Sequence, residues 1–365
     1  MIRKFFGFTV LVIYLLVMAV ASTNGPLVSL QSMILGLLGL IVITIGISAL
    51  AKSIGLVDIP DNIRKIHTGN VPLIGGIVIF ISIVYGTFVF GVDPFYRIII
   101  ISLIPILIIG TIDGIGSIEV PVSFRLIAQI IASWLVILFT DVYLRDLGNL
   151  FGQGTVYLNQ FGIPFTIFAV VGICNAFNML DGKDGLAGSV AVIIISSLLL
   201  LLYLNGIIYN WGLILIVSLA VFLAFNLNLF GQDRKIFLGE HGSSSLGHLI
   251  AWNLVYLSQE TDFITPVTAL WFVFFPLTDA LFTILRRIRL SQSIVKADRR
   301  HFHYLLSDRG FSNSTILFNV VFISILGTAI AVTANSLNIP DYYLFYGYIT
   351  VVICLWLLSE GFIPW

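Results

Sequence analysis

The sequence contains very little charge. Of its 365 residues only 10% are Asp, Glu, Lys or Arg, whereas 59% are hydrophobic and the mean hydropathy is +1.07. A soluble globule of this length would need far more polar surface to meet water. The scarcity of charge therefore excludes a soluble protein and indicates an integral membrane protein.

Cysteine is also scarce, with Cys174 and Cys354 the only two, and both lie within apolar runs. Two cysteines provide neither a disulfide framework nor a zinc site, so we interpret both as packing residues. The sequence also lacks internal repeats, low-complexity tracts and any hydrophilic segment long enough to fold alone. These absences predict a single polytopic domain over residues 30–365.

Long apolar runs, in contrast, are abundant. A helix that crosses the hydrocarbon core needs about 20 apolar residues. The runs are apolar on nearly all sides and contain Gly and Pro, which is typical of packed membrane helices and not of barrel strands. We therefore expect an all-α polytopic membrane protein of about 11–12 transmembrane helices. The twelve runs lie at 5–21, 30–51, 72–90, 98–112, 125–140, 162–178, 187–204, 211–229, 244–257, 266–285, 314–334 and 342–361.

The first 29 residues have two interpretations. Met-Ile-Arg-Lys, the apolar run and Ala19-Val-Ala21 resemble a signal peptide, and they also suit an extra N-terminal hydrophobic helix. In either case the chain near residue 30 begins outside the cytoplasm. If the N-terminus is inside, sixteen of the eighteen Lys and Arg lie in cytoplasmic loops, leaving Arg97 and Arg145 outside.

One polar segment interrupts the apolar pattern most clearly. Residues 175–186 place Asn175, Asn178, Asp181 and Asp184 on a glycine-broken turn between two apolar runs. Such side chains at membrane depth cost free energy unless they pair, face water or bind a ligand. An ordinary acidic loop is the alternative, but the two amides still lie within the apolar pattern, three residues apart. The segment therefore predicts a functional site.

Two further loops on the same predicted face suit an anionic ligand or a cation. Loop 55–76 brings Arg64, Lys65 and His67 before Gly75-Gly76, which opens a helix whose free N–H groups could receive phosphate; a packing role for the two glycines is the alternative. Loop 110–116 carries Asp113, and the next span carries Arg125 and Gln129. A solvated Asp at a helix end is the alternative interpretation of Asp113.

The remaining two loops add an acid and a cationic cluster. Loop 237–247 is rich in glycine and carries Glu240, whose carboxylate could reach a metal; a simple turn is the alternative. Loop 286–309, preceded by Asp279, is rich in Arg and carries His301 and His303, which suit phosphate oxygens and sugar hydroxyls. A solvated loop, a surface for anionic lipid headgroups and a bare His metal pair are the alternatives. Together the five segments predict a site for a phosphorylated, metal-bound substrate and a lipid from the bilayer.

These segments resemble the polyprenyl-phosphate N-acetylhexosamine-1-phosphate transferases, in particular the WecA type. The resemblance covers about residues 30–358 and is most specific at 175–186, 71–76, 266–271 and 298–303. It implies transfer of a sugar 1-phosphate, typically from UDP-GlcNAc, to undecaprenyl phosphate, with release of UMP and with Mg²⁺ or Mn²⁺ as cofactor. It also implies initiation of O antigen or common antigen synthesis at the bacterial inner membrane, with a cytoplasmic active site, and it leaves a homodimer open.

The same resemblance assigns residues to roles by matching position. Asn178 and Glu240 resemble the metal-binding pair, with Asp113 beside them near the lipid phosphate. Asp181 and Asp184 resemble nucleotide-binding and site-organising acids, while the 300–303 loop resembles the part that holds sugar and pyrophosphate. The expected catalytic set is Asp113, Asp181, Asp184, His301 and His303; the substrate-binding set is Lys65, His67, Asn175, Lys183 and Arg300; the metal set is Asp113, Asn178 and Glu240.

The sequence departs from the family pattern at three positions. Gly114 replaces the second acid of an Asp-Asp pair, Glu240 replaces an Asp, and Tyr304 replaces the last His of His-x-His-His. Because Mg²⁺ demands near-ideal octahedral geometry, the longer Glu240 could shift the ion or favour Mn²⁺. A transferase for another UDP-N-acetyl sugar and a non-catalytic relative or lipid-binding transporter or scaffold are the alternatives. A transporter should carry charges near the midplane, and an MraY-type enzyme would lack the WecA-like segments 266–271 and 298–303.

Overall fold

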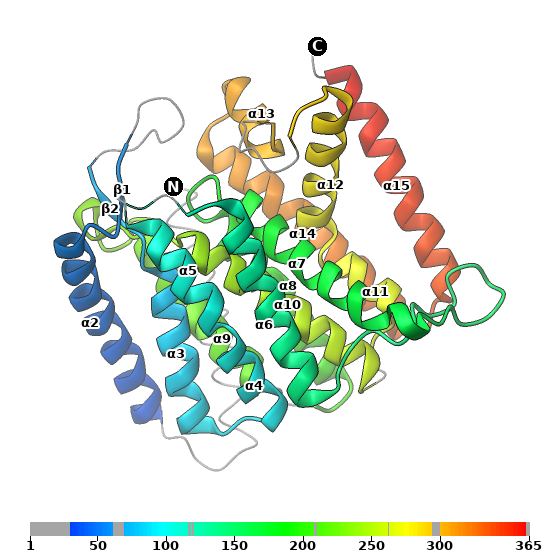
Figure 1. The fold of residues 1–365 in the computed structure, drawn as a ribbon, viewed down its shortest axis with the longest axis horizontal. Coiled ribbons are helices and arrows are strands. Elements are labelled where there is room, and N and C mark those ends of the chain that lie inside the picture. Colours follow the sequence, from blue (N-terminus) through cyan, green and yellow to red (C-terminus); the bar gives the residue numbers. More distant parts are fainter. Residues whose placement is uncertain are drawn as a thin grey trace.

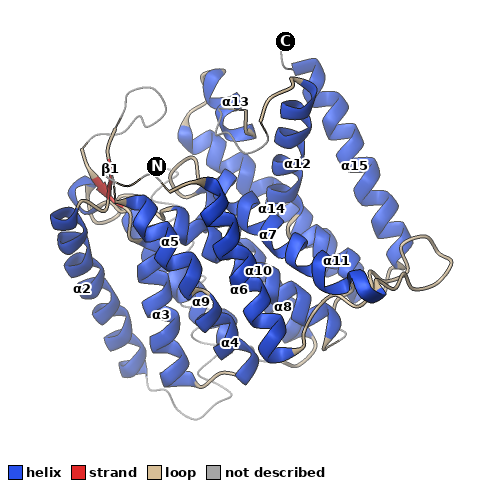
Figure 2. Ribbon diagram, in the orientation of Figure 1, coloured by secondary structure: helices blue, strands red, loops and turns tan. Residues whose placement is uncertain are grey.

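The computed structural model describes residues 30–60, 69–115, 118, 120–207, 210–261, 263–293 and 300–362. Most of these residues are helical, as Figure 2 shows, and the one regular sheet among them pairs β1 (Val57–Asp58) with β2 (Val71–Pro72). The helices are α2 (Leu30–Ile54), α3 (Gly75–Phe90), α4 (Pro94–Ser102), α5 (Ile104–Gly114), α6 (Val122–Thr140), α7 (Gly162–Leu180), α8 (Leu186–Leu204), α9 (Asn210–Asn226), α10 (Glu240–Gln259), α11 (Pro266–Phe272), α12 (Phe274–Arg289), α13 (Phe302–Asp308), α14 (Asn313–Ser336) and α15 (Asp341–Phe362), with short 3₁₀ turns at Asn159–Phe161 and Gln232–Arg234.

The helices confirm an all-α polytopic membrane fold. Each predicted run from 30–51 onwards coincides with a helix or a helix pair, whereas the run 5–21 and the whole segment 1–29 lie outside the described residues. By length and composition, seven described helical segments are able to cross a membrane, one of them formed by α4 and α5 together. The number is eight if α11 and α12, bent by 82°, form one span. Helices α3 and α9 are apolar but shorter. The total of about 11–12 spans stays a prediction.

Helix α10 lies in the middle of the bundle, packed against α7, α5 and α3 (Figure 1). It is buried along nearly its whole length, including polar residues such as His248 and Asn253. At Gly247 its backbone lies so close to α7 that an added Cβ would come within 2.5 Å of the Cys174 Cα. Because protein and not lipid surrounds α10, it tolerates polar side chains that a lipid-facing helix would not.

The two cysteines differ in their surroundings. Cys174 is fully buried between α7 and α10, as its predicted packing role requires. Cys354 is exposed on α15, so the packing interpretation is wrong for this residue. Hydropathy could not separate the two, because an apolar run suits both a helix in the protein core and a helix on its surface.

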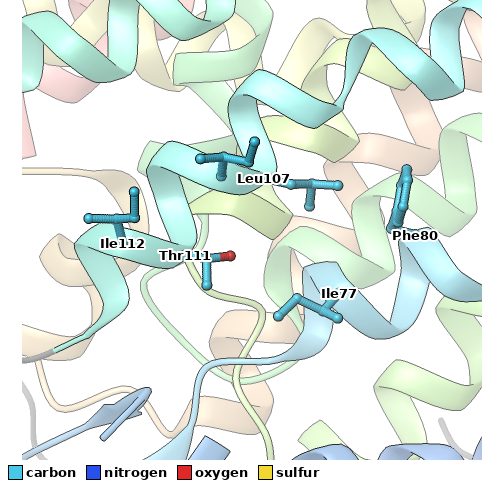
Figure 3. Close-up of a pocket in the computed structure, with 6 residues that line it drawn as sticks. Ile77, Phe80, Leu107, Thr111 and Ile112 are labelled. Atoms are coloured by element: carbon cyan, nitrogen blue, oxygen red, sulfur yellow. The ribbon is translucent and has the colours of Figure 1, made fainter. Parts of the chain in front are cut away.

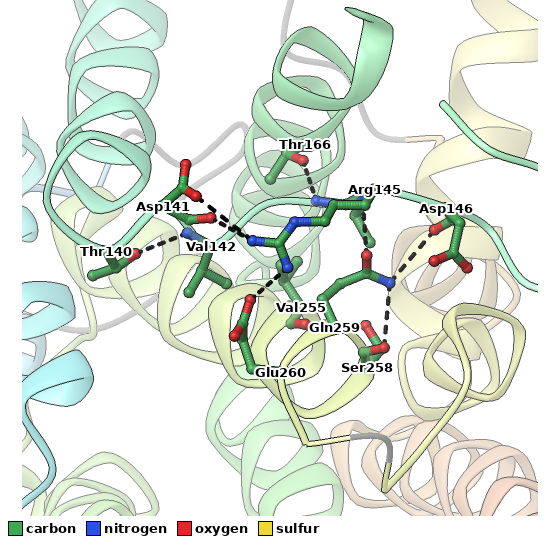
Figure 4. Close-up of polar contacts among 11 residues, drawn as sticks. Thr140, Asp141, Val142, Arg145, Asp146, Thr166, Val255, Ser258, Gln259 and Glu260 are labelled. Atoms are coloured by element: carbon green, nitrogen blue, oxygen red, sulfur yellow. Dashed lines mark hydrogen bonds and ion pairs between the residues drawn. The ribbon is translucent and has the colours of Figure 1, made fainter. Parts of the chain in front are cut away.

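Polar residues lie at both ends of the helix bundle. β1, β2 and α13 lie at one end of the bundle, and the loop after α6 lies at the other (Figure 1). At that second end Arg145 donates to Glu260 Oε1 at 2.8 Å and to the Asp141 carbonyl at 3.0 Å, and its backbone N–H donates to Gln259 (Figure 4). This network fastens the loop after α6 to the end of α10.

Candidate active site

The candidate site lies where several segments meet around the start of α10. Single bridges join Leu56 to Ile115 and Leu73 to Phe237, so the ends of α2 and α5 and the segment before α10 share one small region. The backbone N–H groups of Gly75 and Gly76 donate to the carbonyls of Phe237 and Leu238, at 2.9 Å and 3.0 Å. The prediction that these two N–H groups receive phosphate is therefore wrong.

Their packing role is the alternative that the structure supports. An added Cβ on Gly76 would overlap His241 and Gly242, and one on Gly110 of α5 would lie 2.6 Å from the Cβ of His241. The absence of side chains thus lets α3 and α5 close around the first turn of α10. This close packing fixes the position of Glu240, the first residue of that helix.

Asp113, Arg125 and Glu240 form an acid–arginine cluster. Asp113 lies at the end of α5, Arg125 in the first turn of α6, and Glu240 at the start of α10. Nη1 of Arg125 forms an ion pair with Oε2 of Glu240 and lies 3.6 Å from Oδ2 of Asp113. Their side chains are between 21% and 25% exposed, so a ligand can reach them. Two carboxylates thus share a single guanidinium.

Burial and the neighbouring charges of this cluster change the pKa of Glu240. Burial raises the pKa of Glu240 to about 7; Arg125 opposes this change, and the neighbouring Asp113 carboxylate adds to it. Asp113 also accepts the Val120 backbone N–H at 3.2 Å through Oδ1. One positive charge between two acids leaves the cluster deficient in positive charge, which a bound cation would supply.

Two amides of α7 lie beside this cluster. Asn178 donates to the Ser243 hydroxyl at 3.2 Å, one turn along α10 from Glu240. Asn175 donates to Gln129 Oε1 at 2.8 Å, and Gln129 donates to the hydroxyl of Ser244. Because both amides use their N–H groups in these bonds, their carbonyl oxygens are the atoms left to accept or to ligate.

The acid turn that follows α7, residues 181–184, is fixed from two sides. Asp184 Oδ2 accepts from Lys235 Nζ at 2.7 Å, and Asn226 accepts the Gly185 N–H at 2.7 Å. Gly185 has φ of +77°, which a residue with a side chain rarely adopts. Burial raises the pKa of Asp181, and the charges of Asp184 and Asp58 act in the same direction. The turn therefore brings several carboxyl groups close together.

The loop of residues 300–303, here called the histidine loop, contacts this turn. The ring of His303 lies so close to Gly182 that any side chain there would overlap it. Lys183 reaches from the turn to Ser307 at 3.1 Å and to Asn313 at 2.9 Å, at the ends of α13 and α14. The rings of His301 and His303 are nearly parallel, with centroids 5.8 Å apart. Segments more than a hundred residues apart thus form one polar region.

The predicted residues gather into two groups. Asp113, Glu240 and the two α7 amides surround the start of α10, while the acid turn and the histidine loop form the second group. Helix α7 joins them, since it carries both amides and ends at the acid turn. Lys65 and His67 lie outside the described residues. The roles assigned to these residues stay predictions.

Sequence reasoning gave no role to Arg125, Gln129 or Lys235, although each contacts a predicted site residue. Arg125 and Gln129 were detectable, because they are polar side chains within a predicted membrane run. No comparable signal marks Lys235, which lies in an ordinary basic loop. Its partner Asp184 is 51 residues away, so only the folded chain identifies the pair.

An apolar groove of about 380 Å³ lies between α3 and α5 (Figure 3). Its lining residues come from the two facing helices and include a single polar side chain. They are Ile77, Phe80, Leu107, Ile108, Thr111 and Ile112. One of these lining residues, Ile112, directly precedes Asp113 in the sequence.

The fold and the site together define a polytopic helical membrane protein with an acid- and base-rich site at one end of its bundle. Residues 96–258 match the family model described as glycosyl transferase family 4. The chain is 32% identical to the undecaprenyl-phosphate alpha-N-acetylglucosaminyl 1-phosphate transferase of Escherichia coli O157:H7, over 82% of this chain and 84% of that relative. Proteins of the same name from Yersinia pestis and Haemophilus influenzae are each 32% identical, over 82% and 85% of this chain and 85% and 88% of theirs.

The chain therefore belongs to glycosyl transferase family 4 and is a multi-pass membrane transferase. This finding confirms the family resemblance stated from the sequence.

Proposed function

We propose that this protein transfers GlcNAc 1-phosphate from UDP-GlcNAc to undecaprenyl phosphate and releases UMP. The names of the relatives supply the acceptor and the sugar. The observation that carries the proposal is the acid–arginine cluster, in which Asp113 and Glu240 share Arg125 at the accessible start of α10. Such a cluster suits a reaction between two phosphates, where charge must be neutralised on both reactants.

The cofactor proposed is Mg²⁺ or Mn²⁺. Among the described residues no group of three or more His, Cys, Asp or Glu is placed to hold a metal by itself. The oxygen donors still fit, because Mg²⁺ is usually held by one or two carboxylates together with substrate phosphates. Asp113, Glu240 and the amide oxygen of Asn178 would hold the ion. When bound, it would neutralise charge on the donor pyrophosphate and on the departing UMP.

In this proposal the protein's own residues align the lipid phosphate with the sugar-nucleotide donor. A phosphate monoester has a second pKa of about 6, so the lipid phosphate is already mostly dianionic at cytoplasmic pH. No strong base is then required, and positioning supplies much of the rate enhancement. Asp181 and Asp184 orient the nucleotide in this proposal, while Arg300, His301 and His303 donate to the sugar phosphate. The groove between α3 and α5 offers an apolar surface for an isoprenoid chain.

The proposed setting is the bacterial inner membrane, with the site facing the cytoplasm. The support is the Lys and Arg asymmetry, since Arg145 lies in the loop at the opposite end of the bundle from β1 and β2 (Figure 1). Initiation of O antigen or common antigen synthesis is the proposed biological role. A homodimer stays a prediction.

The test is transfer of radiolabel from UDP-GlcNAc to undecaprenyl phosphate by the purified protein, with Mg²⁺ and Mn²⁺ in parallel. We expect a metal-dependent lipid-linked product that Asp181→Asn loses. Asp341→Asn is the matched control, because Asp341 accepts the Asn149 backbone N–H at 2.9 Å, far from the site. Absence of product with bound UDP-GlcNAc would reject the proposed acceptor, and absence of binding would reject the donor.

A second candidate keeps the reaction and changes the donor to another UDP-N-acetyl sugar. The observation that favours it is Tyr304, whose ring lies 4.2 Å from that of His303 in the loop proposed to hold the sugar. A phenol there differs from imidazole in size and in hydrogen bonding. A panel of UDP-sugars would separate the two candidates, since a donor used at least tenfold faster than UDP-GlcNAc would establish the second.

A further inference from the structure

Asp279 of α12 lies beneath the histidine loop and contacts it twice. Its Oδ2 lies 3.1 Å from Nδ1 of His301, and its Oδ1 accepts the backbone N–H of Phe302 at 2.8 Å. Both the Asp279 and the His301 side chains are only 6% exposed. One carboxylate therefore holds the imidazole ring and the first residue of α13 together, in a part of the molecule from which water is largely excluded.

Thr283, one turn along α12, makes the hydrogen-bond pattern unambiguous. Its Oγ1 lies 2.9 Å from the Asp279 carbonyl oxygen and 3.1 Å from Nδ1 of His301. A carbonyl only accepts, so the hydroxyl hydrogen points to it and Oγ1 offers a lone pair to the ring. The Asp279 carboxylate also only accepts. Both partners of Nδ1 are acceptors, and Nδ1 must therefore carry a hydrogen.

This assignment fixes what the other nitrogen of His301 can do. With Nδ1 always protonated, neutral His301 has a lone pair on Nε2, and charged His301 has a hydrogen there. Only Nε2 changes its protonation. The hydrogen bond at one ring nitrogen commonly decides the chemistry of the other, and a buried carboxylate is an effective partner for this purpose.

The loop carrying His301 is also fixed relative to the acid turn. Arg286, two turns along α12 from Asp279, donates from Nη1 to the Arg300 carbonyl at 3.3 Å. His303, whose ring is nearly parallel to that of His301, lies against Gly182. These contacts therefore hold the His301 ring, oriented by Asp279, beside the residues proposed to bind the nucleotide.

We propose that Asp279 is a positioning residue, which keeps the hydrogen on Nδ1 of His301 and pairs with the doubly protonated ring, so that Nε2–H donates to a phosphate oxygen of the sugar-nucleotide donor. The inference rests on the proposed function, since it takes His301 as a donor-binding residue. Asp279 itself does not touch the substrate. Its effect on the reaction passes through His301.

The kinetic test uses Asp279→Asn. The amide oxygen can still accept from Phe302, but the amide N–H₂ now faces Nδ1. The doubly protonated ring then loses its anionic partner, and the hydrogen of neutral His301 moves to Nε2. We expect kcat to fall by roughly 100-fold, the usual scale for the loss of one donor that stabilises charge in the transition state, with KM for UDP-GlcNAc changed less than about threefold. Asp341→Asn, the matched control, should keep its kcat within about twofold of the wild type.

A double-mutant cycle separates positioning from a merely structural role. If Asp279 acts through His301, Asp279→Asn should lower activity no further in a His301→Ala background. The same fold-loss in both backgrounds would overturn the proposal. So would a wild-type kcat in the single variant.

The ring itself can be observed without any activity, by ¹⁵N NMR of histidine-labelled protein in detergent, with the His301 signals assigned from their loss in His301→Ala. We expect hydrogen on Nδ1 in the wild type and on Nε2 in Asp279→Asn. A wild-type spectrum with neutral His301 protonated on Nε2 would overturn the proposal, even if the variant fails to fold. Conversely, an Nδ1–H signal in a wild-type protein that makes no lipid-linked product would reject the proposed function and leave the Asp279–His301 geometry intact.

Discussion

At the scale of single residues, Arg125 and Glu240 show how a charge pair prepares a site. Arg125 pairs with Glu240 and approaches Asp113, yet burial still raises the pKa of Glu240 to about 7. A protein designed only for stability would gain little from two partly buried acids on one base. The arrangement is more useful as a site that a cation can enter, with Arg125 as the group that holds the acids near each other.

The perturbed carboxyl predicts a pH dependence of metal binding. A metal needs the ionised Glu240, so the apparent affinity for Mn²⁺ should fall roughly tenfold for each pH unit below about 7. Mn²⁺ titration followed by electron paramagnetic resonance between pH 5.5 and 8 measures this slope. Glu240→Gln should bind weakly with a flatter profile, and a wild-type affinity independent of pH would contradict the assignment of Glu240 as a ligand.

The same group affects the metal-free fold with a defined sign. Because the folded pKa lies above the unfolded value of 4.5, the contribution of Glu240 to stability is present below about pH 4.5 and is lost as the pH rises through about 7. The melting temperature of metal-free protein should therefore fall between pH 5 and pH 8 by more in the wild type than in Glu240→Gln. If the melting temperatures of the two proteins change equally with pH, Glu240 does not have a raised pKa in the folded protein.

At the scale of secondary-structure elements, the position of the site depends on how closely α3 and α5 approach α10. Gly76 and Gly110 permit that approach, and the backbone bonds from Gly75 and Gly76 to residues 237 and 238 hold it. Helix packing through small residues is the usual means by which membrane helices come close. The glycines are therefore part of the site, although neither of them supplies a functional group.

The glycine contact predicts a specific packing defect. Gly76→Ala would place a methyl group against Gly242 and His241, and overpacking of this kind costs about 1–3 kcal/mol. The melting temperature in detergent should fall, and transferase activity should fall with it, because Glu240 would move. Gly39→Ala on α2 is the control, since a Cβ there meets nothing within 4 Å and Ala favours a helix. Equal melting temperatures for the two variants would refute the role given to Gly76.

At the scale of the whole molecule, the two ends of the bundle have different chemistry. One end carries the two groups of site residues, and the other carries the network around Arg145 and Glu260 (Figure 4). The separation follows from the membrane, whose hydrocarbon core leaves only the helix ends for charged groups that are not buried in protein. A substrate with a long lipid chain and a charged head would meet the protein at such an end.

The orientation gives a prediction for living cells. In a Cys354→Ser background, a membrane-impermeant maleimide added to intact cells should label Gln153→Cys, in the exposed loop after α6. It should not label Gln232→Cys, which is exposed near the start of α10, until the membrane is opened. The reverse pattern would invert the proposed topology and place the site outside the cytoplasm.

Hydropathy determined the class of this protein and the places of its membrane helices. Apolar runs of helical length leave a chain little choice but to span a bilayer as helices, because unpaired backbone groups are too costly there. Thus α7 and α14 were predictable within a few residues, and so was the turn 181–184 that breaks the pattern. The bend between α11 and α12 was not, since the apolar pattern runs through it without interruption.

The sequence by itself also named most of the acids, amides and histidines of the candidate site, because a polar side chain within or beside a membrane run is conspicuous. Only the tertiary structure decided which of them meet. Arg125 and Glu240 are 115 residues apart, Asp279 and His301 are 22 apart, and the N–H groups of Gly75 and Gly76 turn out to be occupied by the segment before α10. The physical reason is that hydropathy reports the local cost of leaving water, whereas a hydrogen bond or ion pair depends on the packing of helices distant in sequence.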